Sequence, residues 1–484
     1  MDYEAVIGLE VHAQLLTATK LFCGCSSRFG GEPNTRTCPV CLGMPGVLPV
    51  LNKRAVEFAI RASIALGCEI QDKSVFARKN YFYPDLPKGY QISMYERPFS
   101  TKGRLEIEVK GQKKTIGITR IHMEDDAGKL VHAGEFARAE FSFVDLNRTG
   151  TPLLEIVSEP DLRAPEEAVE YVKRLRNILV YIGVCDGNMQ EGSLRCDANA
   201  SVRARGETKF GTRTEIKNMN SFRNIERALA YEIERQTKLC QCGEQVVQET
   251  RLWDDEAGKT AGMRGKEEAH DYRYFPDPDL IPITVDQQWI EKVRGELPEL
   301  PAGKKDRFVK DYGIPEYDAH LLTQDKTLAD YFEDAIKEGA PAKWAANWIM
   351  TELLRELNAE EKTAGQSPVK PVQLAALFKL IDNGTISGKI GKSVFVQMYR
   401  TGREPGELVK EQGLTQVSDD AEIASMVEES IKENPKQLEQ FLAGKDKLFG
   451  FFVGQVMNKS QGKANPGLVN KILAEKLSKL KEKA

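Results

Sequence analysis

Apolar residues in the first 295 positions fall mostly in short runs that alternate with polar residues and end at Gly, Pro or Asn, which is the pattern of β-strands. The runs are AVIGLEVHAQL, LEIEVKGQKKTIGITRIHM, EFSFVDL, LLEIVS and SLRCDANASVRARG. Two stretches instead repeat apolar residues every three or four positions and predict helices: LNKRAVEFAIRASIALG and the segment after Ser221. This part of the chain is therefore expected to be a mixed α/β domain.

Beyond the segment GELPELPAGKKDR, which is rich in Pro, Gly and charge, the spacing becomes helical. LADYFEDAIKEG, AKWAANWIMTELLRELN and PVQLAALFKLIDNG predict helices, and a polar break near GREPGELVKEQG precedes a last helical stretch. The pattern predicts an α+β multidomain protein with a mixed domain at 1–295, an all-helical domain at 296–410 and a small helical tail at 411–484.

The composition is that of a globular protein: 484 residues, 41% hydrophobic and 29% charged, with a net charge of only −4. This balance excludes a uniformly basic nucleic-acid coat, although a local basic patch remains compatible with it. We find no uninterrupted apolar run near the length of a membrane span, and the N-terminal residues do not resemble a secretory signal. We expect a cytoplasmic protein without a membrane segment.

Four of the nine cysteines form two close pairs, Cys23 and Cys25 followed by Cys38 and Cys41. Two pairs separated by a dozen residues can supply four thiolates to one tetrahedral zinc ion. Because four protein ligands leave no position for water, we expect a structural zinc site. The alternative is four unlinked, reduced cysteines.

Acidic residues occur at several predicted strands. In AVIGLEVHAQL, alternation places Glu10 and His12 on the same polar face, where the pair can bind a divalent cation, although a solvated strand face would have the same pattern. Oxygen-rich ligands at further strands would suit Mg²⁺, which assists phosphate chemistry. These further residues are Glu124 and Asp125 in HMEDDAG, Glu155, Asp197 and Glu215.

The sequence has no Walker A loop, no strand–GxGxxG–helix unit and no kinase motif set. The segment GKIGKS is expected to be a basic connection between helices. The stretch ARKNYFYPDLPKGYQIS carries Arg78, Lys79 and Lys88 among aromatic residues and prolines, a combination that suits phosphates together with a base or an aminoacyl end. A surface loop with extended lysines is the alternative.

Six long segments occur along the chain in this order: VIGLEVHAQL, RKNYFYPDLPKGYQIS, IHMEDDAGK, VDLNRTGTPLLEIVSEPD, EGSLRCDAN and DYRYFPDPDL. Together, and in this order, they resemble the B subunits of the glutamyl/aspartyl-tRNA amidotransferases. The resemblance covers essentially the whole chain. It implies an α/β "cradle" domain, a helical domain and a C-terminal tail similar to the YqeY family.

The resemblance also implies an activity. Such a protein belongs to a glutamine-hydrolysing carbon–nitrogen ligase, which uses ATP and Mg²⁺ to phosphorylate the side-chain carboxylate of Glu-tRNA(Gln) or Asp-tRNA(Asn). Ammonia from a partner glutaminase, the family's A subunit, then displaces the phosphate, and the small C subunit completes a heterotrimer. Which of the two products is physiological stays open.

Carried onto this chain, the family's metal positions fall on six residues: Glu10, His12, Glu124, Asp125, Glu155 and Glu215. Either Glu124 or Asp125 could be the ligand at its position. Lys79, Lys88 and Asp197 match polar positions of the family's catalytic pocket and ammonia path and are the expected catalytic residues. Arg78, Lys79 and Lys88 are the expected nucleotide-binding residues. The four-cysteine zinc site occurs in some members of the family.

The last 42 residues, 443–484, contain nine Lys and three acidic residues. A basic helical tail suits contact with a tRNA backbone, although a solvated amphipathic helix can have the same composition. Two further functions remain open: a zinc-stabilised tRNA-binding scaffold without ATP chemistry, and an ATP-dependent enzyme that activates the carboxylate of a small molecule.

Overall fold

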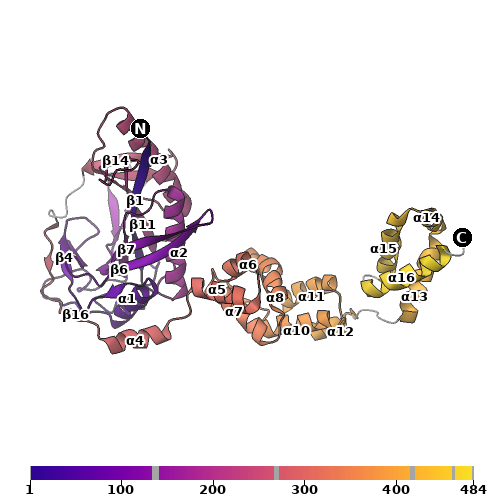
Figure 1. The fold of residues 1–484 in the computed structure, drawn as a ribbon. Coiled ribbons are helices and arrows are strands. Elements are labelled where there is room, and N and C mark those ends of the chain that lie inside the picture. The colour runs from indigo at the N-terminus through magenta and orange to yellow at the C-terminus, as the bar shows by residue number, and fades with distance from the viewer. Residues whose placement is uncertain (1, 133–140, 266–271, 415–419, 461–463, 482–484) are drawn as a thin grey trace. The chain divides into compact units, whose positions relative to one another are not determined.

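The computed structural model describes residues 2–132, 141–265, 272–414, 420–460 and 464–481. The chain forms two compact units, Met1–Leu300 and Pro301–Ala484, which are described separately (Figure 1). Among the described residues, no helix is long and apolar enough to cross a membrane.

A nine-stranded sheet forms the centre of the first unit, in the order β14-β13-β12-β11-β1-β10-β7-β6-β2. β12 and β13 pair in parallel and the other neighbours pair antiparallel. The strands are β1 (Tyr3–Gln14), β2 (Glu69–Ile70), β6 (Ser100–Val109), β7 (Gln112–Asp125), β10 (Pro152–Ser158), β11 (Leu194–Ala204), β12 (Thr214–Lys217), β13 (Glu249–Asp254) and β14 (Lys259–Gly265). The strands predicted from alternation at β1, β6, β7, β10 and β11 are confirmed.

One face of this sheet is apolar and packs against helices. Ile7, Leu9 and Val11 of β1 are fully buried on it, as the alternation predicted. The covering helices are α1 (Lys53–Ala65), α2 (Pro165–Tyr181) and α3 (Phe222–Gln241). The predictions of α1 and α3 are confirmed, and Ser221 caps α3 by accepting a hydrogen bond from the backbone of Asn224 at 3.1 Å. The sequence pattern did not single out α2, because charged residues interrupt its apolar positions.

Among the described residues of the first unit, three small sheets and one α-helix lie outside the central sheet and its covering helices. β15 (Phe275–Pro276), β4 (Ala77–Asn80) and β5 (Tyr90–Ser93) form one sheet, β3 (Lys73–Ser74) pairs with β16 (Ile283–Thr284), and β8 (Lys129–His132) pairs with β9 (Ser142–Asp145). The predicted strand EFSFVDL corresponds to β9, and its first residue, Glu140, lies outside the described residues. The helix is α4 (Gln287–Glu296).

The second unit consists of helices around two separate apolar clusters, one spanning Phe308–Val409 and the other Ile423–Leu477. The helices around the first cluster are α5 (Pro301–Tyr312), α6 (Glu316–Leu322), α7 (Lys326–Lys337), α8 (Ala342–Trp348), α9 (Leu354–Ala359), α10 (Pro371–Asp382), α11 (Gly388–Thr401) and α12 (Pro405–Glu411). Those around the second are α13 (Asp420–Glu433), α14 (Pro435–Leu442), α15 (Phe449–Lys459) and α16 (Pro466–Lys481).

Two local predictions in this unit were wrong. GKIGKS is not a connection but the first turns of α11, where the Ser387 hydroxyl caps the helix. GREPGELVKEQG contains α12, which starts at Pro405 because proline fits the first turn of a helix. The segment GELPELPAGKKDR contains the division between the two units, Leu300 and Pro301, and α5 starts at its Pro301 because proline fits the first turn of a helix. The predicted helix AKWAANWIMTELLRELN runs through α8 and α9 with a π-helical turn, Ile349–Leu353, between them.

Candidate active site

The polar face of the central sheet brings four ionisable side chains from three neighbouring strands together. The strand register places His12 opposite Glu155, and Glu155 opposite His122. His12 Nε2 and His122 Nε2 each lie 3.2 Å from Glu155 Oε2, and His122 Nε2 lies 3.2 Å from Glu124 Oε1. Glu155 and Glu124 are buried. One ligand atom from each of His12, Glu124 and Glu155 falls within 4.8 Å of the others, so these three residues can bind one metal ion.

The charges in this cluster stabilise one another. Burial alone would raise the pKa of Glu155, but the charge of His122 and hydrogen bonds to both histidines hold it well below its usual range. Burial alone would lower the pKa of His122, and the charge of Glu155 with hydrogen bonds to both carboxylates raises it to about 9. The carboxylates are thus held in the ionised form that a metal requires.

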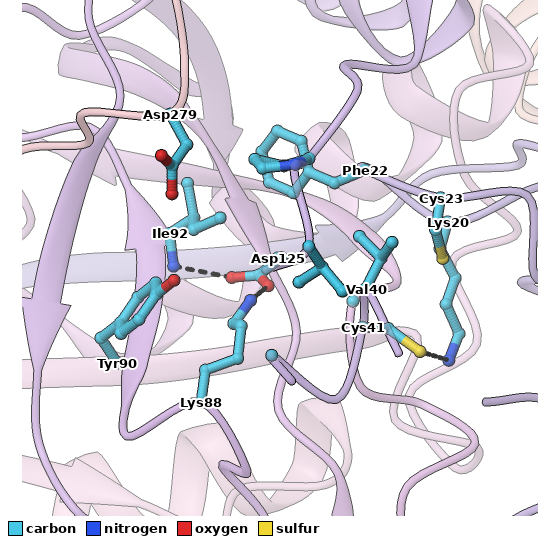
Figure 2. A pocket seen from close by; sticks show the side chains of 14 residues that line it. Lys20, Phe22, Cys23, Val40, Cys41, Lys88, Tyr90, Ile92, Asp125 and Asp279 are labelled. Atoms are coloured by element: carbon cyan, nitrogen blue, oxygen red, sulfur yellow. Dashed lines mark hydrogen bonds and ion pairs between the residues drawn. The ribbon is translucent and has the colours of Figure 1, made fainter. Parts of the chain in front are cut away.

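Strand β5 fixes the orientation of Glu124 and Asp125. Gln91 Nε2 and Ser93 Oγ donate hydrogen bonds to the Glu124 carboxylate at 3.0 and 2.5 Å. The Asp125 side chain instead accepts a hydrogen bond from the backbone N–H of Ile92 at 2.7 Å and forms an ion pair with Lys88 (Figure 2). Glu124 therefore lies with His12 and Glu155, whereas Asp125 is held by Lys88.

Glu10 lies one pleat along β1 from this cluster. Burial raises its pKa, and the nearby charges of Glu155 and Glu215 raise it further. Asn199 Nδ2 donates a hydrogen bond to Glu10 Oε1 at 2.9 Å. Asp197 lies opposite Glu10 in the register and pairs with Lys217 at 2.7 Å, and Lys217 Nζ is also 3.4 Å from Glu215 Oε1. Glu10 and Glu215 thus extend the acidic face beyond the three-residue cluster.

Two of the basic residues expected to bind nucleotide are held by internal contacts. Arg78 pairs with Asp277 at 2.9 Å and with Asp279 at 2.8 Å, and Lys88 pairs with Asp125. Lys79 is different, because its ammonium lies over the rings of Tyr272 and Tyr81 at 5.0 and 5.9 Å.

Burial alone would lower the pKa of Lys79. The nearby charges of Glu124 and, to a smaller extent, Glu155 outweigh the burial and raise the pKa of Lys79. Lys79 therefore supplies a positive charge that faces the acidic cluster.

A cavity of about 490 Å³ opens beside Glu10 on the same face of the sheet. Its walls combine the backbone of β1 and β10 with Phe210, Gly211 and Arg213 from the loop after β11. A cavity with an aromatic ring, backbone groups, a cation and a carboxylate suits a polar ligand with a flat ring.

His122, Lys217, Gln91 and Ser93 were not predicted as site residues. His122 carried a signal, because alternation places it on the same face as Glu124, just as it does Glu10 and His12. The other three take their place from strand pairing and from the packing of the small sheet, and nothing local in the sequence marks them.

The four cysteines of the predicted zinc site converge. Sulfur atoms of Cys23, Cys25, Cys38 and Cys41 all lie within 4.8 Å of one another. The Cys38 backbone N–H donates to Cys41 Sγ at 3.2 Å, and the buried Lys20 ammonium lies 3.6 Å from the same sulfur.

The hydrogen bond from Cys23 lowers the pKa of Cys41, and Lys20 lowers it further. Four sulfur donors with a compensating cation fit a structural Zn²⁺ ion, since a zinc with four thiolates carries a net charge of −2.

The fold and the two clusters define a class: an α+β multidomain protein with a four-cysteine site and a buried carboxylate–imidazole cluster on its central sheet. Residues 5–291 match the family described as the GatB/GatE catalytic domain, and residues 330–477 match the family described as the GatB domain. The chain belongs to the GatB family.

Its relatives include proteins named as the B subunit of an aspartyl/glutamyl-tRNA(Asn/Gln) amidotransferase. Those of Thermodesulfovibrio yellowstonii and Geobacter sulfurreducens are both 59% identical to this chain, over 98% and 99% of it and over 99% and 100% of the relative. That of Carboxydothermus hydrogenoformans is 56% identical over 99% of this chain and 100% of the relative. The family resemblance seen in the sequence is confirmed.

Proposed function

We propose that this protein is the B subunit that amidates Glu-tRNA(Gln), Asp-tRNA(Asn) or both, at the expense of ATP, in the cytoplasm. The relatives named for this activity match it over nearly their full length. The observation that carries the proposal is the cluster of His12, Glu124 and Glu155, on the same sheet face as Glu10, which lines a cavity large enough for a nucleotide. In this proposal the glutaminase (A) partner supplies ammonia, and the small (C) partner completes the heterotrimer.

The chemistry requires activation of the carboxylate, because a carboxylate oxygen is a poor leaving group and phosphate is a good one. The side-chain oxygen of the charged amino acid attacks the γ-phosphate of ATP, and ADP leaves. Ammonia then attacks the carbonyl carbon, and the phosphate departs with its bonding electrons. A Mg²⁺ ion held at the acidic cluster would supply positive charge to neutralise the phosphates in the first step.

His12, Glu124 and Glu155 would hold the metal, with Glu10 and Glu215 on the same face available to a second ion. Lys79 orients and neutralises anionic groups at the cluster, since its charge already faces Glu124. Lys88 and Asp197 act through their ion pairs with Asp125 and Lys217. In this proposal Asp125 is not a metal ligand: it pairs with Lys88 and follows the ligand Glu124 in the chain.

The base of ATP fits the cavity beside Glu10. Phe210 offers a flat surface for stacking, and Arg213 offers a cation for phosphate at the cavity wall. A nucleotide bound there would extend its phosphates along the polar face of the sheet. Because Arg78 is paired with two aspartates, its role is to hold β4 against the segment 277–279.

The test is the pair of variants Glu155→Gln and Glu10→Gln in the reconstituted complex. Each substitution keeps the volume and removes an anion that a hard cation prefers, so tRNA-dependent ATP hydrolysis and amidation should fall about 100-fold or more. Glutamine hydrolysis by the glutaminase partner and binding of charged tRNA should persist. Glu4→Gln, on the same strand and face but distant from the cluster, is the matched control. Wild-type amidation in both site variants would refute the metal assignment.

A binding assay and a product assay address the remaining alternatives. A zinc-stabilised RNA scaffold would bind charged tRNA but would lose nothing when Glu155 is changed. An enzyme for a small-molecule carboxylate would hydrolyse ATP without charged tRNA. Amidation of Glu-tRNA(Gln) and of Asp-tRNA(Asn), each supplied alone to the purified complex, identifies the substrate.

A further inference from the structure

The loop that carries Cys38 and Cys41 continues into a glycine that lies directly against Lys88. Gly43 has a φ of +66°, and a Cβ atom placed on it would lie 2.4 Å from Lys88 Cγ and 3.2 Å from Lys88 Cα. Contacts of this length force the lysine to move, because real Cβ atoms do not approach other carbons so closely. Only glycine therefore allows the loop backbone to contact the stem of Lys88.

Lys88 is confined on its other sides as well. Its side chain is 6% exposed and that of Asp125 is 2% exposed, and the two form an ion pair. A cavity of about 30 Å³ separates this pair from the cysteine cluster, and its walls include Cys23, Cys41, Gly43, Lys88 and Asp125 (Figure 2). The segment 23–43, which we call the four-cysteine loop, thus forms one wall of the cavity that Lys88 also lines.

The position of Asp125 is coupled to that of Glu124. Ile92 N–H donates to the Asp125 carboxylate, while Gln91 Nε2 donates both to the Asp125 carbonyl and to Glu124 Oε2, each at 3.0 Å. A shift of Lys88 therefore displaces Asp125. Through the hydrogen bonds of Asp125 it also displaces β5 and the end of β7, where Glu124 lies in the acidic cluster.

We propose that the four-cysteine loop is a positioning element of the active site, and that Gly43 sets the place of Lys88 and, through Asp125, of Glu124. This role rests on the proposed function and adds to it, since a purely structural zinc site would affect stability alone. A zinc ion on the four cysteines would hold the loop. The loop backbone at Gly43 holds the stem of Lys88, and the ammonium of Lys88 holds Asp125.

The experiment compares Gly43→Ala with Gly46→Ala in the reconstituted complex. Gly46 also has a positive φ, +85°, but a Cβ atom there meets nothing within 4 Å, so the control carries the same backbone strain without the contact. We expect Gly43→Ala to lower kcat for amidation about tenfold or more, with an unchanged KM for charged tRNA and a full zinc content. Gly46→Ala should stay within about twofold of wild type.

Lys88→Met separates this inference from the proposed function. If Gly43 acts through the ammonium, Gly43→Ala should cause no further loss of kcat in the Lys88→Met background. If Lys88→Met has low activity but Gly43→Ala and Gly46→Ala are equally active, the positioning role of Gly43 is refuted. The role of Lys88 in the site then still stands. Wild-type amidation by Lys88→Met would overturn the role of Lys88 in the site as well. Should Gly43→Ala fail to fold, Gly43→Asn and Gly46→Asn repeat the comparison, because Asn tolerates a positive φ.

Discussion

Two adjacent acidic residues, Glu124 and Asp125, have different partners because successive side chains of a strand point to opposite faces. The sequence left open which of them would bind metal. In the structure Glu124 lies with His12 and Glu155, whereas Asp125 is committed to Lys88 and the backbone of Ile92. The geometry therefore favours Glu124 as the ligand.

The two residues should respond differently to loss of charge. Glu124→Gln should raise the Mg²⁺ concentration needed for half-maximal amidation about tenfold or more, because a charged oxygen is lost from the cluster. Asp125→Asn should leave that concentration close to wild type, because Glu124 stays in the cluster with its charge. It should lower kcat and the melting temperature, because Lys88 then remains buried without its counterion. Magnesium titrations and thermal unfolding of both variants check this, and the reverse pattern would assign Asp125 as the ligand.

The polar face of β1 could be predicted from the sequence because alternation is local. That Glu10 and His12 share a strand face follows from their spacing alone. Their partners Glu155 and His122 lie more than 100 residues away in the sequence, and only the pairing of β1 with β10, and of β10 with β7, brings them together. Lys217 and Gln91 could not be predicted, since they occupy strands of four residues whose periodicity is too short to identify.

At the level of elements, a buried carboxylate ties helix α3 to the edge of the sheet. Glu232 is fully buried and accepts hydrogen bonds from Thr214 of β12 at 2.8 Å and Thr260 of β14 at 3.0 Å. Arg235 and Gln236 of the same helix also donate to it. Burial alone would raise the pKa of Glu232, but the bonds from Arg235 and Gln236 outweigh burial and lower it.

This carboxylate should make stability depend on pH. Because the pKa of Glu232 is lower in the folded than in the unfolded protein, its contribution is complete above the unfolded value, near 4.5, and is lost as the pH falls through the folded value. Glu232→Gln should cost about 2 kcal/mol at pH 7, and the difference from wild type should shrink in the acid range. Urea unfolding between pH 3 and 7 measures it. A pH-independent difference would show that the charge contributes nothing.

The zinc site is the element for which sequence spacing was most informative, since two close pairs of cysteines allow few other arrangements. We expect about one zinc per chain. Cys23→Ser should reduce zinc content and lower the melting temperature of the first unit by several degrees, because the loop loses the bonds that hold it. Cys242→Ser, at an exposed cysteine outside the cluster, is the control. Metal analysis that finds no zinc in protein purified without chelator would remove the assignment.

At the level of the whole molecule, the C-terminal helices of the second unit have an apolar cluster of their own. Helices α13 to α16 surround an apolar cluster that includes Ile423, Val427, Phe452 and Leu473, while Leu414 packs on the preceding cluster. The change of charge near the end of the chain was visible in the sequence. The sequence could not show which lysines form ion pairs, because ion pairs between helices depend on how the helices pack. Lys459 pairs with Glu429 and Glu433, and Lys476 pairs with Glu428.

These helices should contribute affinity for tRNA and little chemistry. Deletion of residues 415–484 keeps Leu414 and should raise the KM for charged tRNA while reducing its salt dependence, because lysine contacts with phosphate release counterions.

Replacing the exposed Lys447, Lys471 and Lys479 with Gln should have a similar, smaller effect, with a loss of roughly 0.9 in the logarithmic salt slope for each contact removed. Lys459→Gln is the matched control, since that ammonium already has two carboxylate partners. The measurement is amidation at saturating ATP between 50 and 200 mM salt. A KM that stays at the wild-type value across this range in the deletion variant would place tRNA binding elsewhere.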